Sequence, residues 1–297
     1  MTSARSVLYV PGDRSDMLAH AVSRGADALI LDLEDAVAPT AKELARHTVF
    51  DFLRTRAASD VGDVEIWVRV NPGELGLADI AAVASPALAG FVLAKTEHTH
   101  HVRAAGYAAD EVEQRLGLTP GSLGLCPLLE SAAAVMDARG IAGASARVRR
   151  LQIGEADLRA EIGVSLGDTE HELLLVRSAV VLASAAAGVG APLASVSTDF
   201  TDLDRFRATT EAQRRLGFRG RACIHPAQCA VANEVFTPSA EQMQQAQRLI
   251  ERYEAAASDA VFTDEDGRMV DLAVIRDARR LVAHTEQTAR PIRGATR

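Results

Sequence analysis

Two acidic residues, Glu130 and Asp157, follow two short apolar runs in the middle of the chain. The runs, Leu123–Leu129 and Val148–Ile153, are too short for ordinary helices and are typical of buried strands. The interval Ser131–Gly143 has the spacing of a helix. Parallel neighbouring strands joined by that helix would place both carboxylates at one edge of a sheet. Such a pair suits Mg²⁺, which prefers oxygen ligands and retains several waters. The alternative is that one acid caps the helix and the other solvates a loop.

Other charged or polar residues follow other short apolar runs. They are Arg14, Asp32, Glu34, Asp35, Arg69, Asn71, Lys95 and His225. The opposite ends of the runs begin with small, apolar or unremarkable charged residues. In a barrel of parallel strands the active site lies at the carboxyl ends of the strands. This distribution therefore predicts a functional rim.

Each candidate also has a structural interpretation. The planar guanidinium of Arg69 suits a substrate carboxylate or an enolate oxygen, but an ion pair with the Glu34/Asp35 cluster explains it equally well. Lys95 is placed to form a Schiff base or, as is commoner for such a lysine, an ion pair. Because alternate strand residues point to opposite sides, we expect Asp32, Glu34 and Asp35 not to face one point.

The alternation of apolar runs and helical segments predicts the elements that position these residues. The predicted strands are Ser6–Val10, Asp27–Leu33, Glu65–Val70, Gly90–Ala94, Leu123–Leu129, Val148–Ile153, Leu193–Val196 and Arg221–Ile224. The sixth helix should begin at Thr169, with Glu172 at capping-box spacing. Eight strand–helix units predict an α/β fold, a (β/α)₈ TIM barrel over residues 1–236. A doubly wound sheet is less favoured because no GxGxxG opens a helix.

Residues 237–297 are extra to the barrel. Ser239 and Gln242 have capping-box spacing before a long amphipathic helix. Asp266–Gly267 predicts a hairpin, and a closing helix should begin near Leu272. We expect this C-terminal extension to act as a lid and an oligomer contact.

Composition excludes several classes of function. The 297 residues carry a formal net charge of −8, which argues against nucleic acid or an acidic membrane as the main partner. The three cysteines lack metal-site spacing and are expected to be small core residues in a reducing compartment. No apolar stretch reaches transmembrane length and the N-terminus lacks a signal-peptide pattern, so we expect a soluble cytoplasmic protein.

Seven short stretches, which occur in order over nearly the whole chain, together form a pattern specific enough to indicate a family. They are LYVPGDR (Leu8–Arg14), LILDLEDAV (Leu29–Val37) followed by Lys42 and Arg46, VRVN (Val68–Asn71), LLES (Leu128–Ser131), GEADL (Gly154–Leu158), GFRGRACIHPAQ (Gly217–Gln228) and DGRMVD (Asp266–Asp271). The chain thereby resembles the citrate lyase β-subunit-like family of the HpcH/HpaI aldolase group, which is related to malyl-CoA and citramalyl-CoA lyases.

The resemblance implies a metal-dependent barrel that cleaves or forms a carbon–carbon bond between an acyl-CoA enolate and a 2-oxo acid. It places Mg²⁺ on Glu130 and Asp157, and the oxo acid and developing enolate on Arg69. It also implies that Asp271 enters a neighbouring subunit's site, which makes the protein a homotrimer or a hexamer. With these catalytic residues we group Arg14, Glu34, Asp35 and Lys95 as substrate-binding candidates.

The chain departs from the family pattern at three positions. His20 stands where relatives often carry a lysine thought to meet CoA phosphates, Ala194 where an aspartate is common, and Ala94 where proline is usual. These differences bear on CoA recognition and acyl specificity. The leading hypothesis is a Mg²⁺-dependent lyase acting on malyl-, citramalyl- or citryl-CoA. The alternatives are a metal-dependent aldolase on free 2-oxo acids, an acyl-CoA thioesterase, and a non-catalytic or carrier-dependent lyase subunit.

Overall fold

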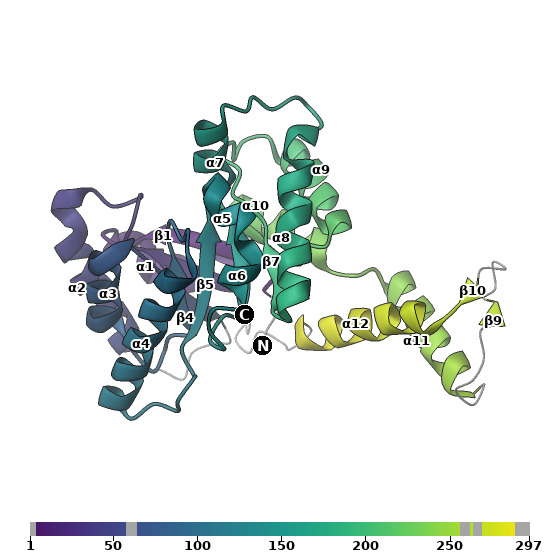
Figure 1. Ribbon diagram of the computed structural model, residues 1–297, viewed down its shortest axis with the longest axis horizontal. Helices are drawn as coiled ribbons and strands as arrows, with labels where there is room; N and C mark the ends of the chain where they lie inside the picture. The colour runs from purple at the N-terminus through teal and green to yellow at the C-terminus, as the bar shows by residue number, and fades with distance from the viewer. Residues whose placement is uncertain (1–3, 58–63, 256–261, 264–268, 289–297) are drawn as a thin grey trace. The chain divides into compact units, whose positions relative to one another are not determined.

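Eight parallel strands form the centre of the first of two compact units in the computed structural model (Figure 1). The model describes residues 4–57, 64–255, 262–263 and 269–288. The strands are β1 (Ser6–Pro11), β2 (Ala28–Asp32), β3 (Glu65–Val70), β4 (Gly90–Leu93), β5 (Gly124–Leu129), β6 (Arg150–Ile153), β7 (Gly190–Leu193) and β8 (Arg221–Cys223). They pair in the order β7-β6-β5-β4-β3-β2-β1-β8, and a parallel bridge between Ala194 and Arg221 joins the two outer strands. The predicted barrel is confirmed.

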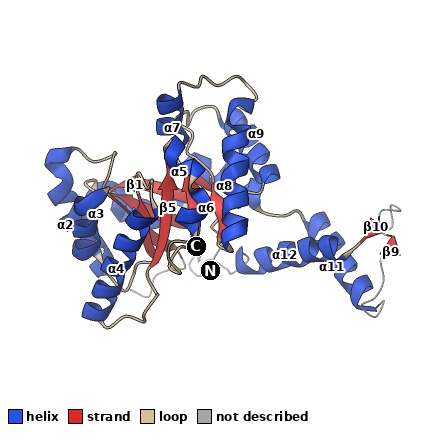
Figure 2. Ribbon diagram, viewed as in Figure 1, coloured by secondary structure: helices blue, strands red, loops and turns tan. Residues whose placement is uncertain are grey.

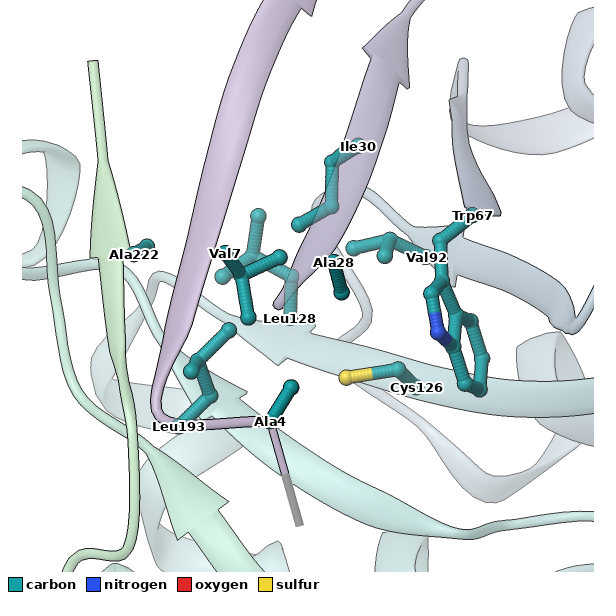
Figure 3. Packing of buried hydrophobic residues seen from close by; sticks show 10 residues of the cluster. All are labelled: Ala4, Val7, Ala28, Ile30, Trp67, Val92, Cys126, Leu128, Leu193 and Ala222. Atoms are coloured by element: carbon teal, nitrogen blue, oxygen red, sulfur yellow. The ribbon is translucent and has the colours of Figure 1, made fainter. Parts of the chain in front are cut away.

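Continuous apolar strands form here because both faces of the sheet are covered. Every residue of β2 and β5 is buried. Side chains of alternate residues, among them Val7, Ile30, Trp67 and Leu128, fill the inside of the barrel (Figure 3). Helices lie outside the strands (Figure 2). A strand buried on both faces reads as an unbroken apolar run, which is why the pattern was visible in the sequence.

The helices of this unit follow the strands in turn. They are α1 (Ser15–Ala21), η1 (Val22–Arg24), η2 (Pro39–Ala41), α2 (Lys42–Ala57), α3 (Gly73–Val83), α4 (Thr99–Leu116), α5 (Ala132–Met136), α6 (Ala138–Ala142), α7 (Glu155–Ile162), η3 (His171–Leu173), α8 (Leu174–Ala187), α9 (Leu203–Leu216) and α10 (Pro226–Phe236). The helix expected over Ser131–Gly143 is two short helices, α5 and α6. The short helix α7 was not predicted.

Two boundaries differ from the sequence prediction. Thr169 does not begin the sixth helix: Glu170 has a left-handed backbone (φ 52°), the Glu172 carboxylate accepts a bond from the Gly167 N–H at 3.3 Å, and α8 begins at Leu174. Strand β7 ends at Leu193 rather than beginning there. Pairing of β6 with Gly190 and Leu193 fixes its position, although Gly190 and Pro192 resemble turn residues.

The second unit begins at Phe236. It contains α11 (Ala240–Ala255), the antiparallel pair β9 (Phe262–Thr263) and β10 (Met269–Val270), and α12 (Leu272–Thr288). The predicted capping box is present, because Gln242 donates its N–H to Ser239 Oγ at 3.1 Å and accepts the Ser239 N–H at 3.0 Å. The predicted turn at Asp266–Gly267 lies outside the described residues. No described helix is long and apolar enough to cross a membrane.

Candidate active site

Glu130 lies immediately beyond β5, with its side chain buried beside the end of β6. Leu129 pairs with Ile153, and the Gly154 N–H donates to the Leu129 carbonyl at 2.9 Å, so Glu130 lies next to Gly154. A Cβ at position 154 would stand 2.5 Å from Glu130 Cγ. The absence of a side chain at Gly154 therefore makes the space that the carboxylate occupies.

Asp157 faces the same cavity from the first turn of α7. The cavity has a volume of about 270 Å³ and is lined by Lys95, Glu97, Glu130, Ser131, Asp157 and Glu161. Acidic residues in a first turn favour a helix through its dipole, which accounts for α7 beginning at Glu155. The two carboxylates of the sequence hypothesis thus lie together, although Asp157 is on a helix and not in a loop.

The Glu130 carboxyl group lacks charge compensation. Its side chain is 6% exposed, and Oε2 makes no hydrogen bond with any described residue. Burial raises the pKa of Glu130 to about 8, the neighbouring Asp157 adds to the increase, and Arg69 opposes it. An unpaired buried carboxylate oxygen is costly and marks a functional position.

These residues fit a magnesium ion. Glu130 and Asp157 supply the hard oxygen donors that Mg²⁺ prefers, and the orphaned Oε2 is a ligand without a partner in the described chain. Across the described residues, no group of three or more His, Cys, Asp or Glu side chains forms a metal site. Two carboxylates are sufficient for Mg²⁺, because it takes its remaining ligands from water and substrate.

Arg69 lies on the other side of the rim in a paired network. In the sheet register Arg69 stands opposite Asp32, and Asp32 accepts bonds from Arg69 Nε at 2.7 Å and Nη2 at 2.5 Å. Arg69 Nη1 lies 3.0 Å from Glu34 Oε2. The guanidinium also stacks 5.1 Å from the centre of the Tyr9 ring, and Tyr9 accepts a bond from Gln152. These carboxylates raise the pKa of Arg69 despite its burial.

Lys95 joins the network to the cavity. Its backbone is left-handed (φ 48°), which is rare for a residue with a side chain. Its ammonium lies 2.7 Å from Glu34 and 3.2 Å from Asp35, and the bond to Glu34 raises the pKa of Lys95. A lysine that forms a Schiff base needs a lowered pKa, so the structure favours the ion-pair interpretation of Lys95.

As expected, no single described cation contacts Asp32, Glu34 and Asp35 together, but pairs of these acids share a partner. Asp32 and Glu34 both contact Arg69, and Glu34 and Asp35 both contact Lys95. The strand ends at Asp32 and the chain then bends, so strand alternation no longer applies beyond it. Glu34 and Ala36 donate their N–H groups to the Asp32 carboxylate, which fixes the bend.

Side-chain hydrogen bonds from Lys42 and Asn71 hold the bend after Asp32 in place. Lys42 donates to the carbonyls of Leu33 and Glu34 at 2.7 and 2.6 Å. Asn71 donates to the Leu33 carbonyl at 2.9 Å and to Asp79 at 2.7 Å. Asn71 therefore supports the bend and does not line the cavity that contains Glu130.

Comparison with known proteins decides the family. The sequence profile of the HpcH/HpaI aldolase/citrate lyase family matches residues 5–226. The chain belongs to this family. The expected resemblance is confirmed, and with it the class of enzyme, a citrate lyase β-subunit-like carbon–carbon lyase.

Relatives in this family are similar over almost their whole length. The citrate lyase subunit beta-like protein of Deinococcus radiodurans is 36% identical over 285 residues, covering 94% of this chain and 96% of that protein. The L-malyl-CoA/beta-methylmalyl-CoA lyase of Cereibacter sphaeroides is 30% identical over 306 residues, covering 95% and 94%. The crystal structure of CitE from Mycobacterium tuberculosis in complex with magnesium, acetoacetate and coenzyme A matches with a TM-score of 0.74 and 27% identity, covering 95% of this chain and 97% of that one.

Arg14, His20 and Ala194 of the first unit are not among the residues that line the cavity that contains Glu130. Arg14 is exposed and pairs with Asp16 at 2.9 Å. His20 is exposed on α1, and Ala194 is buried where β7 meets β8. Asp271 belongs to the second unit, where its Oδ1 accepts the N–H groups of Ala273 and Val274 and caps α12.

Three cavity residues were not singled out from the sequence: Glu97, Ser131 and Glu161. Ser131 Oγ accepts the Ala134 N–H at 3.2 Å, which caps α5. Glu161 accepts the Ala132 N–H at 2.8 Å and so links α7 to the segment after Glu130. Glu161 lies four residues after Asp157, the spacing of one helix face, and prediction of α7 would have revealed it.

Proposed function

We propose that this protein is a Mg²⁺-dependent lyase acting on a 3-hydroxyacyl-CoA such as malyl-, citramalyl- or citryl-CoA. Cleavage breaks the bond between the carbon that bears the hydroxyl group and the carbon next to the thioester. The products are a 2-oxo acid and an acyl-CoA, and condensation is the reverse. The observation that carries the proposal is the orphaned, buried Oε2 of Glu130 beside Asp157 in an open cavity.

Glu130 and Asp157 would hold the ion, as they do in the hypothesis from sequence. The chemistry that Mg²⁺ supplies when bound is polarisation of the substrate's hydroxyl or oxo oxygen. Release of the proton from Glu130 accompanies metal binding, because only the carboxylate form is a ligand. A related crystal structure supports the cofactor, since it contains CitE of M. tuberculosis in complex with magnesium, acetoacetate and coenzyme A.

Arg69 and Lys95 would stabilise negative charge on the substrate. Asp32 and Glu34 hold the Arg69 guanidinium in one orientation, so no reorganisation is needed when charge develops on an enolate or carboxylate oxygen. Lys95 lines the cavity with its charge retained by Glu34 and Asp35. Both cations are thus preorganised for an anionic oxo acid.

The proton acceptor is proposed to be Asp271 of a neighbouring subunit in a trimer or hexamer. Its carboxylate stands at the start of α12, and a carboxylate delivered by a separate segment can take the hydroxyl proton while excluding water. The electron pair of the broken bond passes to the thioester enolate, which then gains a proton at carbon.

One assay tests the function against its alternatives. Purified protein is incubated with Mg²⁺ and malyl-, citramalyl- or citryl-CoA, and separately with the free hydroxy acids. We expect acyl-CoA and a 2-oxo acid from a thioester, and none after chelation. Turnover of free acids alone would identify an aldolase, free CoA without carbon–carbon cleavage a thioesterase, and binding without turnover a non-catalytic subunit. Each of these three results overturns the proposal.

A further inference from the structure

A second cavity lies between α3 and α4, outside the strands. Its volume of about 310 Å³ is at the lower end of the range found for small-molecule sites. Val70 and Leu93 form part of its wall, and they alternate with Arg69 and Val92, which face the barrel interior. The cavity is therefore separate from the one that holds Glu130.

The inner wall of this cavity is apolar. Val70, Leu77, Ile80, Leu93 and Ala105 line it. Small residues on α4 keep it open, because Ala104 and Ala105 project little side chain between the two helices. The wall suits a short hydrocarbon chain.

The lining of this cavity also contains polar side chains, three of which are basic residues. Lys95, His100 and His101 line it, together with the acid Glu74. The imidazole rings of His100 and His101 are 4.3 Å apart between centroids, in an edge-to-face arrangement. Three basic side chains against one carboxylate favour an anionic or hydrogen-bond-accepting group on the ligand.

Lys95 lines both cavities. Its left-handed backbone places it between them, and its ammonium contacts Glu34, which in turn contacts Arg69. A ligand group that draws the ammonium away from Glu34 would change the charge around Arg69. Occupation of the cavity between α3 and α4 would thus change the electrostatic environment of the proposed active site.

We propose that the cavity between α3 and α4 binds a short-chain monocarboxylate, with its chain against the apolar wall and its carboxylate at Lys95, His100 and His101. The ligand is an effector and not a substrate, because the strands separate it from Glu130. Binding requires neither Mg²⁺ nor a thioester, so the test is independent of the proposed function.

Calorimetric titration of the full-length, Mg²⁺-free protein with butyrate, hexanoate and 1-hexanol tests the ligand class. We expect hexanoate to bind more tightly than butyrate, by about fourfold for each added CH₂ group. We expect 1-hexanol to bind more weakly than hexanoate because it lacks the carboxylate. Absence of hexanoate binding, or equal affinity for 1-hexanol, would overturn the proposal.

Two matched variants test the location. Ala104→Leu fills the cavity, whereas Ala108→Leu adds the same side chain one turn further along α4, outside the lining. We expect the first to abolish hexanoate binding and the second to retain it, with circular dichroism confirming that both fold. Unchanged affinity in Ala104→Leu would place the ligand elsewhere and refute the site.

The exposed residue His100 provides a variant that does not disturb packing. We expect His100→Gln to weaken hexanoate binding severalfold while leaving the affinity for 1-hexanol unchanged. An equal loss for both ligands, or no loss for either, would contradict recognition of the carboxylate by this group.

Discussion

The two sides of the rim differ in whether their charged side chains have partners. At the ends of β2 and β3, Arg69 is bound by Asp32 and Glu34, and Lys95 is bound by Glu34 and Asp35. At the ends of β5 and β6, Glu130 is buried with an oxygen that no described residue satisfies. A buried ion pair requires that its partners be present, whereas an unsatisfied acid indicates that a ligand supplies the missing charge.

The paired charges hold the rim in position, whereas the unpaired carboxylate belongs to the proposed metal site. The compensated side is rigid without any ligand, because the Asp32 carboxylate also accepts the N–H groups of Glu34 and Ala36. If Glu130 and Asp157 hold a metal ion as proposed, the uncompensated side should depend on pH and on that cation. Removal of an acid should therefore have opposite consequences on the two sides, with stability lost on one and metal binding lost on the other.

The largest effect is expected from Glu130→Gln. The amide cannot replace the carboxylate as a metal ligand, and the contribution of a bound ion amounts to several kcal/mol, so kcat/KM should fall by about 10³-fold. The free energy of unfolding at neutral pH should change little, because Gln resembles the protonated acid. The lyase assay measures kcat/KM, calorimetry measures the Mg²⁺ affinity, and urea unfolding measures the free energy of unfolding. Retained Mg²⁺ affinity would show that the uncompensated side is not the metal site.

Asp32→Ala should instead destabilise the fold by about 3–5 kcal/mol, because it leaves the Arg69 guanidinium buried without its main partner. Urea unfolding of the metal-free protein measures the loss. The matched control is Asp16→Ala, which breaks the exposed pair with Arg14 and should leave the free energy of unfolding nearly unchanged. Equal losses in the two variants would remove the contrast between a structural and a surface ion pair.

Glu161 tests how the uncompensated side is positioned. Its carboxylate accepts the Ala132 N–H and so links the segment carrying Glu130 to the helix carrying Asp157. Glu161→Ala should weaken Mg²⁺ binding about tenfold, within the range for partners outside the ligand shell. Glu161→Gln keeps a hydrogen-bond acceptor and should bind Mg²⁺ nearly as the parent does. If both variants lose affinity equally, the charge of Glu161 matters and not its hydrogen bond.

The sequence predicted the barrel and the position of Glu130 because both depend on local pattern. Eight apolar runs alternate with helical segments, and an acid directly after a buried run must lie at a strand's carboxyl end. The helix carrying Asp157 was missed, since its eight residues show no clear apolar periodicity. The convergence of Asp32 and Glu34 depends on a bend whose hydrogen bonds are formed only in the folded chain.

Other parts of the site follow from packing and are not readable from residue types. Gly154 is a glycine because Glu130 Cγ occupies the position of its Cβ, and these residues are far apart in sequence. The cavity between α3 and α4 exists only because two helices meet through small residues. Residue type and spacing thus located the rim, whereas tertiary contacts determine which of its charges are paired.

A pH dependence tests the contrast most directly. Burial raises the pKa of Glu130 to about 8, against about 4.3 for a free glutamate. Between these values the folded, metal-free protein holds a proton that the unfolded chain has lost, so the free energy of unfolding should fall as pH rises through this window. Below pH 8, the Mg²⁺ affinity should rise by up to tenfold for each unit by which the pH is raised, because binding of the metal ion releases a proton.

Calorimetry in buffers of different ionisation enthalpy measures that proton, and Glu130→Gln is the control because it has no titratable group at the position. Its unfolding free energy should lose the downward slope that the parent shows. Proton-independent Mg²⁺ binding near pH 7 would mean that Glu130 is already ionised in the metal-free protein. Its charge would then be compensated like that of Asp32, and the two sides of the rim would not differ in kind.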